Sequence, residues 1–206
     1  MQKIDAKAYL PTFIRLISDI ALALPGATVT RFPNKEDNWL ANINTPQIAL
    51  YLKLDSIAGK LDISVDWPSW KSPRCDKNVV TYQDIASMLT QDERNAVVTS
   101  IKSSVDKGAA KIARDIQTRL IPYAELAYRR AVERCQTNEK TWNAQHTTLV
   151  ELSQYFNIPM GYQSDRLLTN GVEIQVNTAT SVRIHNISCS PEMAKKIIAL
   201  LRSEKK

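Results

Sequence analysis

The first part of the chain carries a hydrophobic pattern with helical spacing. Between residues 10 and 24, apolar side chains recur every three or four positions, which predicts an amphipathic helix with one buried face. Pro25 and Gly26 follow this stretch. They predict the end of the helix, because proline cannot continue the helical hydrogen bonds and glycine accepts a left-handed cap.

The pattern then changes to the alternation of apolar and polar residues that is typical of strands. Strands are predicted at residues 28–32, 39–43, 48–54 and 61–65. Alternation of this kind indicates an antiparallel sheet with one face on a core and the other in water. A short helix is predicted to follow, capped by Thr81 and ending at Leu89, and then a further strand at residues 96–101.

Helical patterns dominate the middle of the chain. Ser104 is predicted to cap a helix that begins at Val105, and Pro122 to end or kink it. A second helix is predicted from Tyr123 to about Phe156, with a break near residues 137–138 left open. Towards the C-terminus, residues 172–176 and 181–184 predict a β-hairpin, followed by a helix that begins after residue 190.

These patterns predict an α+β fold. An N-terminal helix lies on an antiparallel meander of four or five strands, with long central helices and a C-terminal β-hairpin plus helix. The predicted division is a helix-plus-sheet unit in residues 1–104, a helical segment in 105–157 and a small hairpin-and-helix unit in 158–206. The last unit and the first can also pack as one domain.

Composition narrows the class of protein. Of the 206 residues, 44% are hydrophobic and 23% are charged, as in an ordinary globular protein, and the net charge of +6 favours anionic partners. Cys75, Cys135 and Cys189 are far apart and lack metal-site spacing, which favours a reducing compartment without disulfides. No apolar run approaches the roughly 18 residues of a membrane span. A cytoplasmic protein without a membrane partner is therefore predicted.

Basic residues concentrate in the predicted central helices. Residues 102–140 hold nine basic and five acidic side chains. A basic helix face opposite an apolar one can bind phosphates, although a solvated lysine-rich face gives the same pattern. The predicted phosphate-binding residues are Lys107, Lys111 and Arg114 on the first helix and Arg129, Arg130 and Arg134 on the second.

An irregular segment after the meander combines aromatic and basic residues. Trp67 and Trp70 precede Lys71 and Arg74 in this segment. Tryptophan rings can stack on bases while neighbouring cations hold the phosphates. The same tryptophans can instead pack on the sheet or form a contact site for a protein partner, where tryptophan and arginine are enriched. The sequence leaves these three interpretations open.

The sequence carries no pattern that predicts catalysis. His146 and His185 lie in different elements, and neither belongs to a metal-binding motif. Asp62 and Asp66 share one face of a strand with Ser64, which is interpreted as a solvated polar face rather than a magnesium site. Glycine-rich phosphate loops are absent. The prediction is a protein that is not an enzyme and has no metal or cofactor.

The order of helix, antiparallel strands and a helix carrying Lys107-Gly-Ala-Ala-Lys111 resembles a double-stranded RNA-binding domain. In that family, lysines at the start of the final helix contact phosphates. Here an extra strand, the tryptophan segment and a further helix precede the lysines. The resemblance is therefore one of element order, which carries little weight for function.

Two functional hypotheses follow. The first is a non-enzymatic nucleic-acid-binding accessory protein that uses the basic helix face on phosphates of DNA or RNA. The alternative is a protein-interaction module, an adaptor or inhibitor of a larger complex, which binds its partner through the long helices and the tryptophan segment and does not bind nucleic acid. The sequence sets neither the type of nucleic acid nor the oligomeric state.

Overall fold

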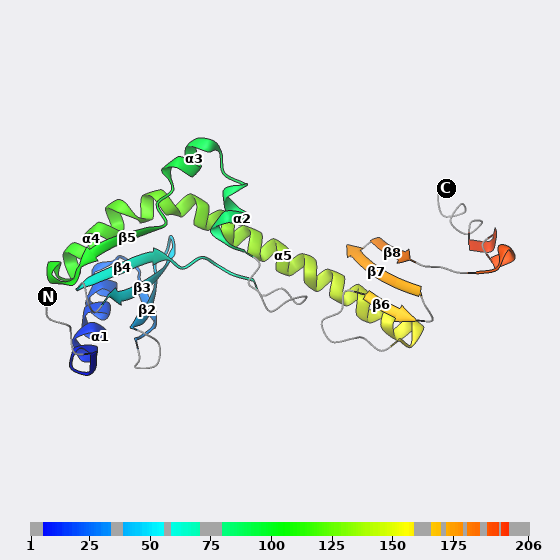
Figure 1. Ribbon diagram of the computed structural model, residues 1–206, viewed down its shortest axis with the longest axis horizontal. Helices are drawn as coiled ribbons and strands as arrows, with labels where there is room; N and C mark the ends of the chain where they lie inside the picture. Colours follow the sequence, from blue (N-terminus) through cyan, green and yellow to red (C-terminus); the bar gives the residue numbers. More distant parts are fainter. Residues whose placement is uncertain are drawn as a thin grey trace. The chain divides into compact units, whose positions relative to one another are not determined.

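The chain folds into two compact units, each described here by itself (Figure 1). Unit 1 comprises Met1–Trp70 and Asn78–Gln136, and unit 2 comprises Lys71–Lys77 and Thr137–Lys206. The computed structural model describes residues 6–33, 39–55, 59–70, 80–158, 166–169, 172–178, 181–185, 189–193 and 195–197.

Unit 1 contains a five-stranded antiparallel sheet in which every strand pairs with its neighbour in sequence, in the order β1-β2-β3-β4-β5. The strands are β1 (Thr28–Arg31), β2 (Leu40–Asn44), β3 (Ala49–Asp55), β4 (Lys60–Val65) and β5 (Ser100–Ser104). In the middle of the sheet, Leu52 lies opposite Ile63, and Ile63 lies opposite Ile101. The predicted meander of four or five strands is confirmed.

Two helices cover one face of this sheet. They are α1 (Ala6–Ala23) and α4 (Ala109–Arg119), which contact each other beside the strands (Figure 1). Their apolar stripes join the inward side chains of the sheet in one core, because alternate strand residues point to the same face. The fully buried core side chains include Phe13, Ile17 and Ile20 of α1, Ile112 and Ile116 of α4, and Leu50, Leu52, Leu61 and Ile63 of the sheet.

The predicted end of α1 is confirmed. Leu24 is the first residue beyond the helix, and Gly26 has a φ of +68°, a backbone conformation that glycine adopts without strain. A side chain at this position would also meet a neighbour, since an added Cβ would lie 2.9 Å from Cγ of Pro46. The turn after α1 is therefore packed closely on the turn between β2 and β3.

Two short helices connect β4 to β5, namely α2 (Tyr82–Ala86) and α3 (Gln91–Ala96). Each begins with a capping box. The side chain of the N-cap residue, Thr81 or Thr90, accepts a hydrogen bond from the backbone N–H of the residue three positions later, Asp84 or Glu93. The carboxylate of that residue accepts one from the backbone N–H of the N-cap. The backbone N–H groups of Thr81 and Thr90 thereby lower the pKa of Asp84 and Glu93.

The predictions for this connection need correction. The helix from Thr81 to Leu89 ends earlier, at Ala86, and α3 was not predicted. The strand predicted at residues 96–101 lies at Ser100–Ser104, because Ala96 still belongs to α3.

The helices after β5 also differ from the prediction. Val105–Lys107 form a single 3₁₀ turn, η1, and Gly108, with a φ of +74°, separates this turn from α4. A new helix, α5 (Ile121–Phe156), begins next to Pro122 as predicted and runs without a break at residues 137–138. No helix in the described part of the chain is both long and apolar enough to cross a membrane.

Unit 2 contains the second half of α5 and a three-stranded antiparallel sheet, β6 (Arg166–Thr169), β7 (Val172–Thr178) and β8 (Ser181–His185). The predicted hairpin is β7 and β8, and β6 is an additional strand. Among the described residues of this unit, the buried side chains are Leu149, Ile158, Leu167, Ile174 and Val176. Residues 191–193 and 195–197 are helical, and the predicted cap is confirmed because Ser190 Oγ accepts a hydrogen bond from Met193 N at 3.3 Å.

Candidate nucleic-acid interface

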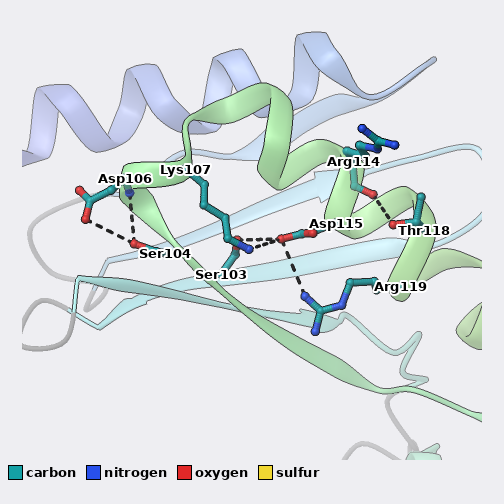
Figure 2. Close-up of polar contacts among 8 residues, drawn as sticks. All are labelled: Ser103, Ser104, Asp106, Lys107, Arg114, Asp115, Thr118 and Arg119. Atoms are coloured by element: carbon teal, nitrogen blue, oxygen red, sulfur yellow. Dashed lines mark hydrogen bonds and ion pairs between the residues drawn. The ribbon is translucent and has the colours of Figure 1, made fainter.

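The outward stripe of α4 carries two cations. Ile112, Ala113 and Ile116 are buried in the core, whereas Lys111 and Arg114 are exposed. Within the described part of the chain, neither of these two side chains makes an ion pair or a hydrogen bond. The guanidinium of Arg114 is directed away from the carboxylate of Asp115 (Figure 2).

The third predicted cation of this region, Lys107, is exposed but paired within unit 1. Oδ2 of Asp115 accepts hydrogen bonds from Lys107 Nζ at 2.8 Å and from Ser103 Oγ at 3.2 Å, and Arg119 Nη1 lies 3.8 Å away (Figure 2). The bond from Lys107, followed by that from Ser103, lowers the pKa of Asp115 against the opposing effect of desolvation. The Asp115 carboxylate thus joins β5, η1 and α4.

Two of the three predicted arginines of α5 also have internal partners. Arg134 Nη1 donates to the carbonyl oxygen of Asp84 at 2.8 Å, and Arg130 Nη1 donates to that of Met88. Arg130 also pairs with Glu93, at 3.5 Å. These carbonyls lie at and beyond the last turn of α2, where helical partners are missing. Arg130 and Arg134 therefore fasten α2 and α3 to α5.

Arg129 differs from its two neighbours on α5. Its side chain is exposed, and no ion pair or hydrogen bond of this side chain occurs within the described residues. The six predicted phosphate-binding residues therefore fall into two classes. Lys111, Arg114 and Arg129 point to solvent, whereas Lys107, Arg130 and Arg134 support the fold.

The tryptophan segment is partly buried. The centroid of the Trp67 ring lies 5.2 Å from that of Tyr82 and 6.2 Å from that of Tyr128. Trp67 packs against the core of the sheet and also against a second hydrophobic cluster of unit 1, formed by Val80, Ile85, Leu89, Ala127 and Ala131. Burial raises the pKa of Tyr128. Trp70 is half-buried. The predicted cations Lys71 and Arg74 lie outside the described residues.

The polar face of the sheet lies opposite the helices. Asp62 pairs with Lys102 at 3.3 Å, and Asp66 accepts a hydrogen bond from Asn42 Nδ2 at 2.6 Å. These carboxylates are thus used within the sheet. Over the described ranges, no three His, Cys, Asp or Glu side chains gather in a way that could hold a metal ion.

Sequence reasoning missed Asp115 and Ser103 as the partners of Lys107. In a continuous helix from Val105, the side chain of Lys107 would not reach Asp115, eight positions later. Gly108 was the signal in the sequence that the helix is interrupted between these residues.

No protein-family model matches this chain, and comparisons with curated proteins and with solved structures find no match either.

Proposed function

We propose that the protein is a non-enzymatic, cytoplasmic nucleic-acid-binding accessory protein that contacts phosphates through the outward stripe of α4. The observation that supports this is the separation of charge on that helix. Asp115, the one acidic residue in the sequence of α4, is held by Ser103 and Lys107. Among the described residues, Lys111 and Arg114 are consequently left without a countercharge on the exposed side of the helix.

The N-terminal end of α4 adds to this positive potential. Gly108 is the N-cap and provides no side-chain hydrogen bond to the first turn. The first backbone N–H groups of a helix lack helical partners and carry a partial positive charge, so they attract anions. Lys111 lies in the same turn. A phosphate bound there contacts both kinds of donor, and Arg114 is placed for the next phosphate.

The internally paired cations have a supporting role in this proposal. Lys107 holds η1 against α4 through Asp115 and so fixes the start of the helix near Lys111. Arg129 is the candidate for a separate phosphate contact from α5. Neutralising each phosphate releases counterions, so binding must weaken as the salt concentration rises.

The test is a fluorescence-anisotropy titration with labelled single- and double-stranded DNA and RNA at several salt concentrations. The double variant Lys111→Glu/Arg114→Glu should bind all ligands at least about tenfold more weakly, and the slope of log K against log salt should fall by about 2. The matched control is Lys53→Glu/Lys60→Glu. It changes the net charge equally but alters exposed residues of β3 and β4 that alternate with core positions.

Three results would contradict the proposal. They are flat curves for all four ligands at low salt, an equal loss in the two double variants, and a salt slope that the α4 substitutions leave unchanged. An equal loss would mean that net charge alone governs binding. Circular dichroism of both variants checks that the fold is intact.

The alternative, a protein-interaction module, is favoured by one observation in unit 2. β8 is an edge strand of the described sheet, and its Val182 and Ile184 are 41% and 52% exposed. Exposed apolar side chains on a strand edge are typical of protein contacts. This function predicts no affinity for nucleic acid and a stoichiometric complex in pull-downs from the native host.

A further inference from the structure

A small pocket lies in unit 1 where the ends of several elements meet. Its volume is about 180 Å³, below the roughly 300–1,000 Å³ of sites for drug-sized ligands. The turn after α1, the turn between β2 and β3, the last part of α4 and the start of α5 supply its walls. The lining residues are Leu24, Pro25, Thr45, Gln47, Gln117 and Ile121.

The pocket is rigidly built on one side. Gly26 approaches Pro46 so closely that even a methyl group would meet its ring. Oγ1 of Thr45 accepts from Ile48 N at 3.0 Å and donates to Ile48 O at 2.8 Å, which fixes the second turn. Two adjacent turns that line the pocket are therefore packed together without any ligand.

The chemistry of the lining is neutral and amphipathic. Leu24, Pro25 and Ile121 provide apolar surface, and no lining residue is charged. The hydroxyl of Thr45 is already used in its turn, whereas the amides of Gln47 and Gln117 have no hydrogen bond within the described residues. Each amide offers donors and an acceptor together. An uncharged flat heterocycle with donors and acceptors along its edge matches this combination.

The pocket also lies next to the basic stripe. Gln117 follows Arg114 by three residues on α4, which places the two side chains side by side and about 4.5 Å apart along the helix axis. A group in the pocket can therefore be covalently linked to a phosphate at Arg114. Nucleotides join a neutral heterocycle to a phosphate in this way.

We propose that this pocket holds one unpaired base of a nucleic-acid strand whose phosphate contacts Arg114. The inference rests on the proposed function and names its substrate class as single-stranded or locally unpaired nucleic acid. A base within a duplex is stacked and paired, so it reaches a pocket only after leaving the stack, at a cost in free energy. Apolar contact with the faces of the base and the two amides on its edge would provide the selectivity.

The experiment compares ligands that share a backbone. Anisotropy titrations at one salt concentration use a labelled single strand, a strand of equal length in which abasic sites replace the bases, and the duplex. Burial of a base is expected to make the single strand bind about tenfold tighter than the abasic strand. The wild-type chain should also prefer the single strand to the duplex at equal phosphate concentration.

A pair of variants locates this preference. Gln47→Ala/Gln117→Ala should lower the affinity for the single strand about fivefold and leave that for the abasic strand unchanged, because two amides are lost and no charge changes. The matched control is Gln83→Ala/Gln154→Ala, which removes two other exposed glutamines. It should leave both affinities unchanged.

The failure of this inference differs from that of the proposed function. If the single and abasic strands bind equally and both depend on Lys111 and Arg114, phosphate binding stands and the base pocket is refuted. The pocket would then be left to another occupant, such as a side chain of a protein partner. An equal loss for both strands in the pocket variant would refute it too. If no ligand binds, both proposals fall together.

Discussion

Units 1 and 2 each place helical residues against one face of an antiparallel sheet, but they differ in how far that face is covered. In unit 1, Leu52 and Ile63 are fully buried beneath α1 and α4. In unit 2, Ile174 of β7 is buried, whereas Ile184, directly opposite it on β8, is 52% exposed. The same kind of apolar strand position therefore has a different environment in each unit.

This difference shows what alternation along a strand determines. It decides which face of the sheet is apolar, because successive side chains point to opposite sides. How much of that apolar face is buried from water depends on how far the packed helices extend across the sheet. Since the stabilisation from apolar burial is roughly proportional to the area removed from water, equivalent residues should contribute unequally to the two units.

The largest expected effect comes from comparing an isoleucine in each sheet. Ile63→Ala should cost unit 1 about 3–4 kcal/mol, since a fully buried side chain leaves a cavity. Ile184→Ala should cost unit 2 less than about 1 kcal/mol, because half of the side chain is already in water. Amide hydrogen exchange of β4 and β7 in increasing urea measures each unit separately.

Either of two outcomes would break the comparison. Equal destabilisation by the two substitutions would mean that Ile184 is as fully covered in solution as Ile63. Loss of protection in β7 when Ile63 is replaced would mean that the units unfold as one cooperative body.

A smaller effect concerns the close contact in unit 1 between the turn after α1 and the turn between β2 and β3. Gly26→Ala should cost about 2–3 kcal/mol, because it combines a positive φ with a contact 2.9 Å from Pro46 Cγ. Gly59→Ala is the matched control, since Gly59 has a φ of +58° but nothing within 4 Å of an added Cβ. It should cost about 1 kcal/mol from the backbone alone. Equal midpoints of urea denaturation in the two variants would show that the contact with Pro46 relaxes freely.

Local patterns were sufficient to predict most of the fold. Alternation located four strands of unit 1, and Pro25-Gly26 located the end of α1. The missed elements are short and lack periodicity, but each carries a signal in the sequence. Thr90-Gln-Asp-Glu93 has the spacing of a capping box for α3. The sequence Asn170-Gly171 is of the Asn-Gly type that predicts a two-residue hairpin turn.

The candidate interface was less accessible to sequence reasoning. Helical spacing correctly placed Lys111 and Arg114 on the exposed stripe of α4. It could not show that Arg134 donates to the carbonyl oxygen of Asp84, 50 residues away in the chain, or that Arg130 donates to that of Met88, 42 residues away. Such contacts depend on tertiary packing between distant segments. A cluster of arginines in a sequence therefore overstates the positive charge available to a ligand.

The smallest effect compares an ion pair from each unit. Asp115→Asn should destabilise unit 1 by about 1–2 kcal/mol at pH 7, because this carboxylate, with 21% of its side chain exposed, accepts from two donors. Glu173→Gln in unit 2 should cost less, about 0.5 kcal/mol. The two pairs are almost equally exposed, since 20% of the Glu173 side chain is exposed, but among the described residues Glu173 accepts from Arg166 alone.

The effect of pH on the Asp115 variant follows from the sign of the shift. The hydrogen bond from Lys107 lowers the pKa of Asp115 below its ordinary value of 3.8, so the native state binds a proton less readily than the unfolded chain. The stabilisation is complete above the unfolded pKa and is lost as the pH falls through the native pKa. Urea denaturation at several pH values should show the gap between wild type and Asp115→Asn closing below about pH 4. A gap that stays constant down to about pH 2 would mean that the amide introduced by the substitution disturbs packing, and that the charge of Asp115 does not hold Lys107 in place.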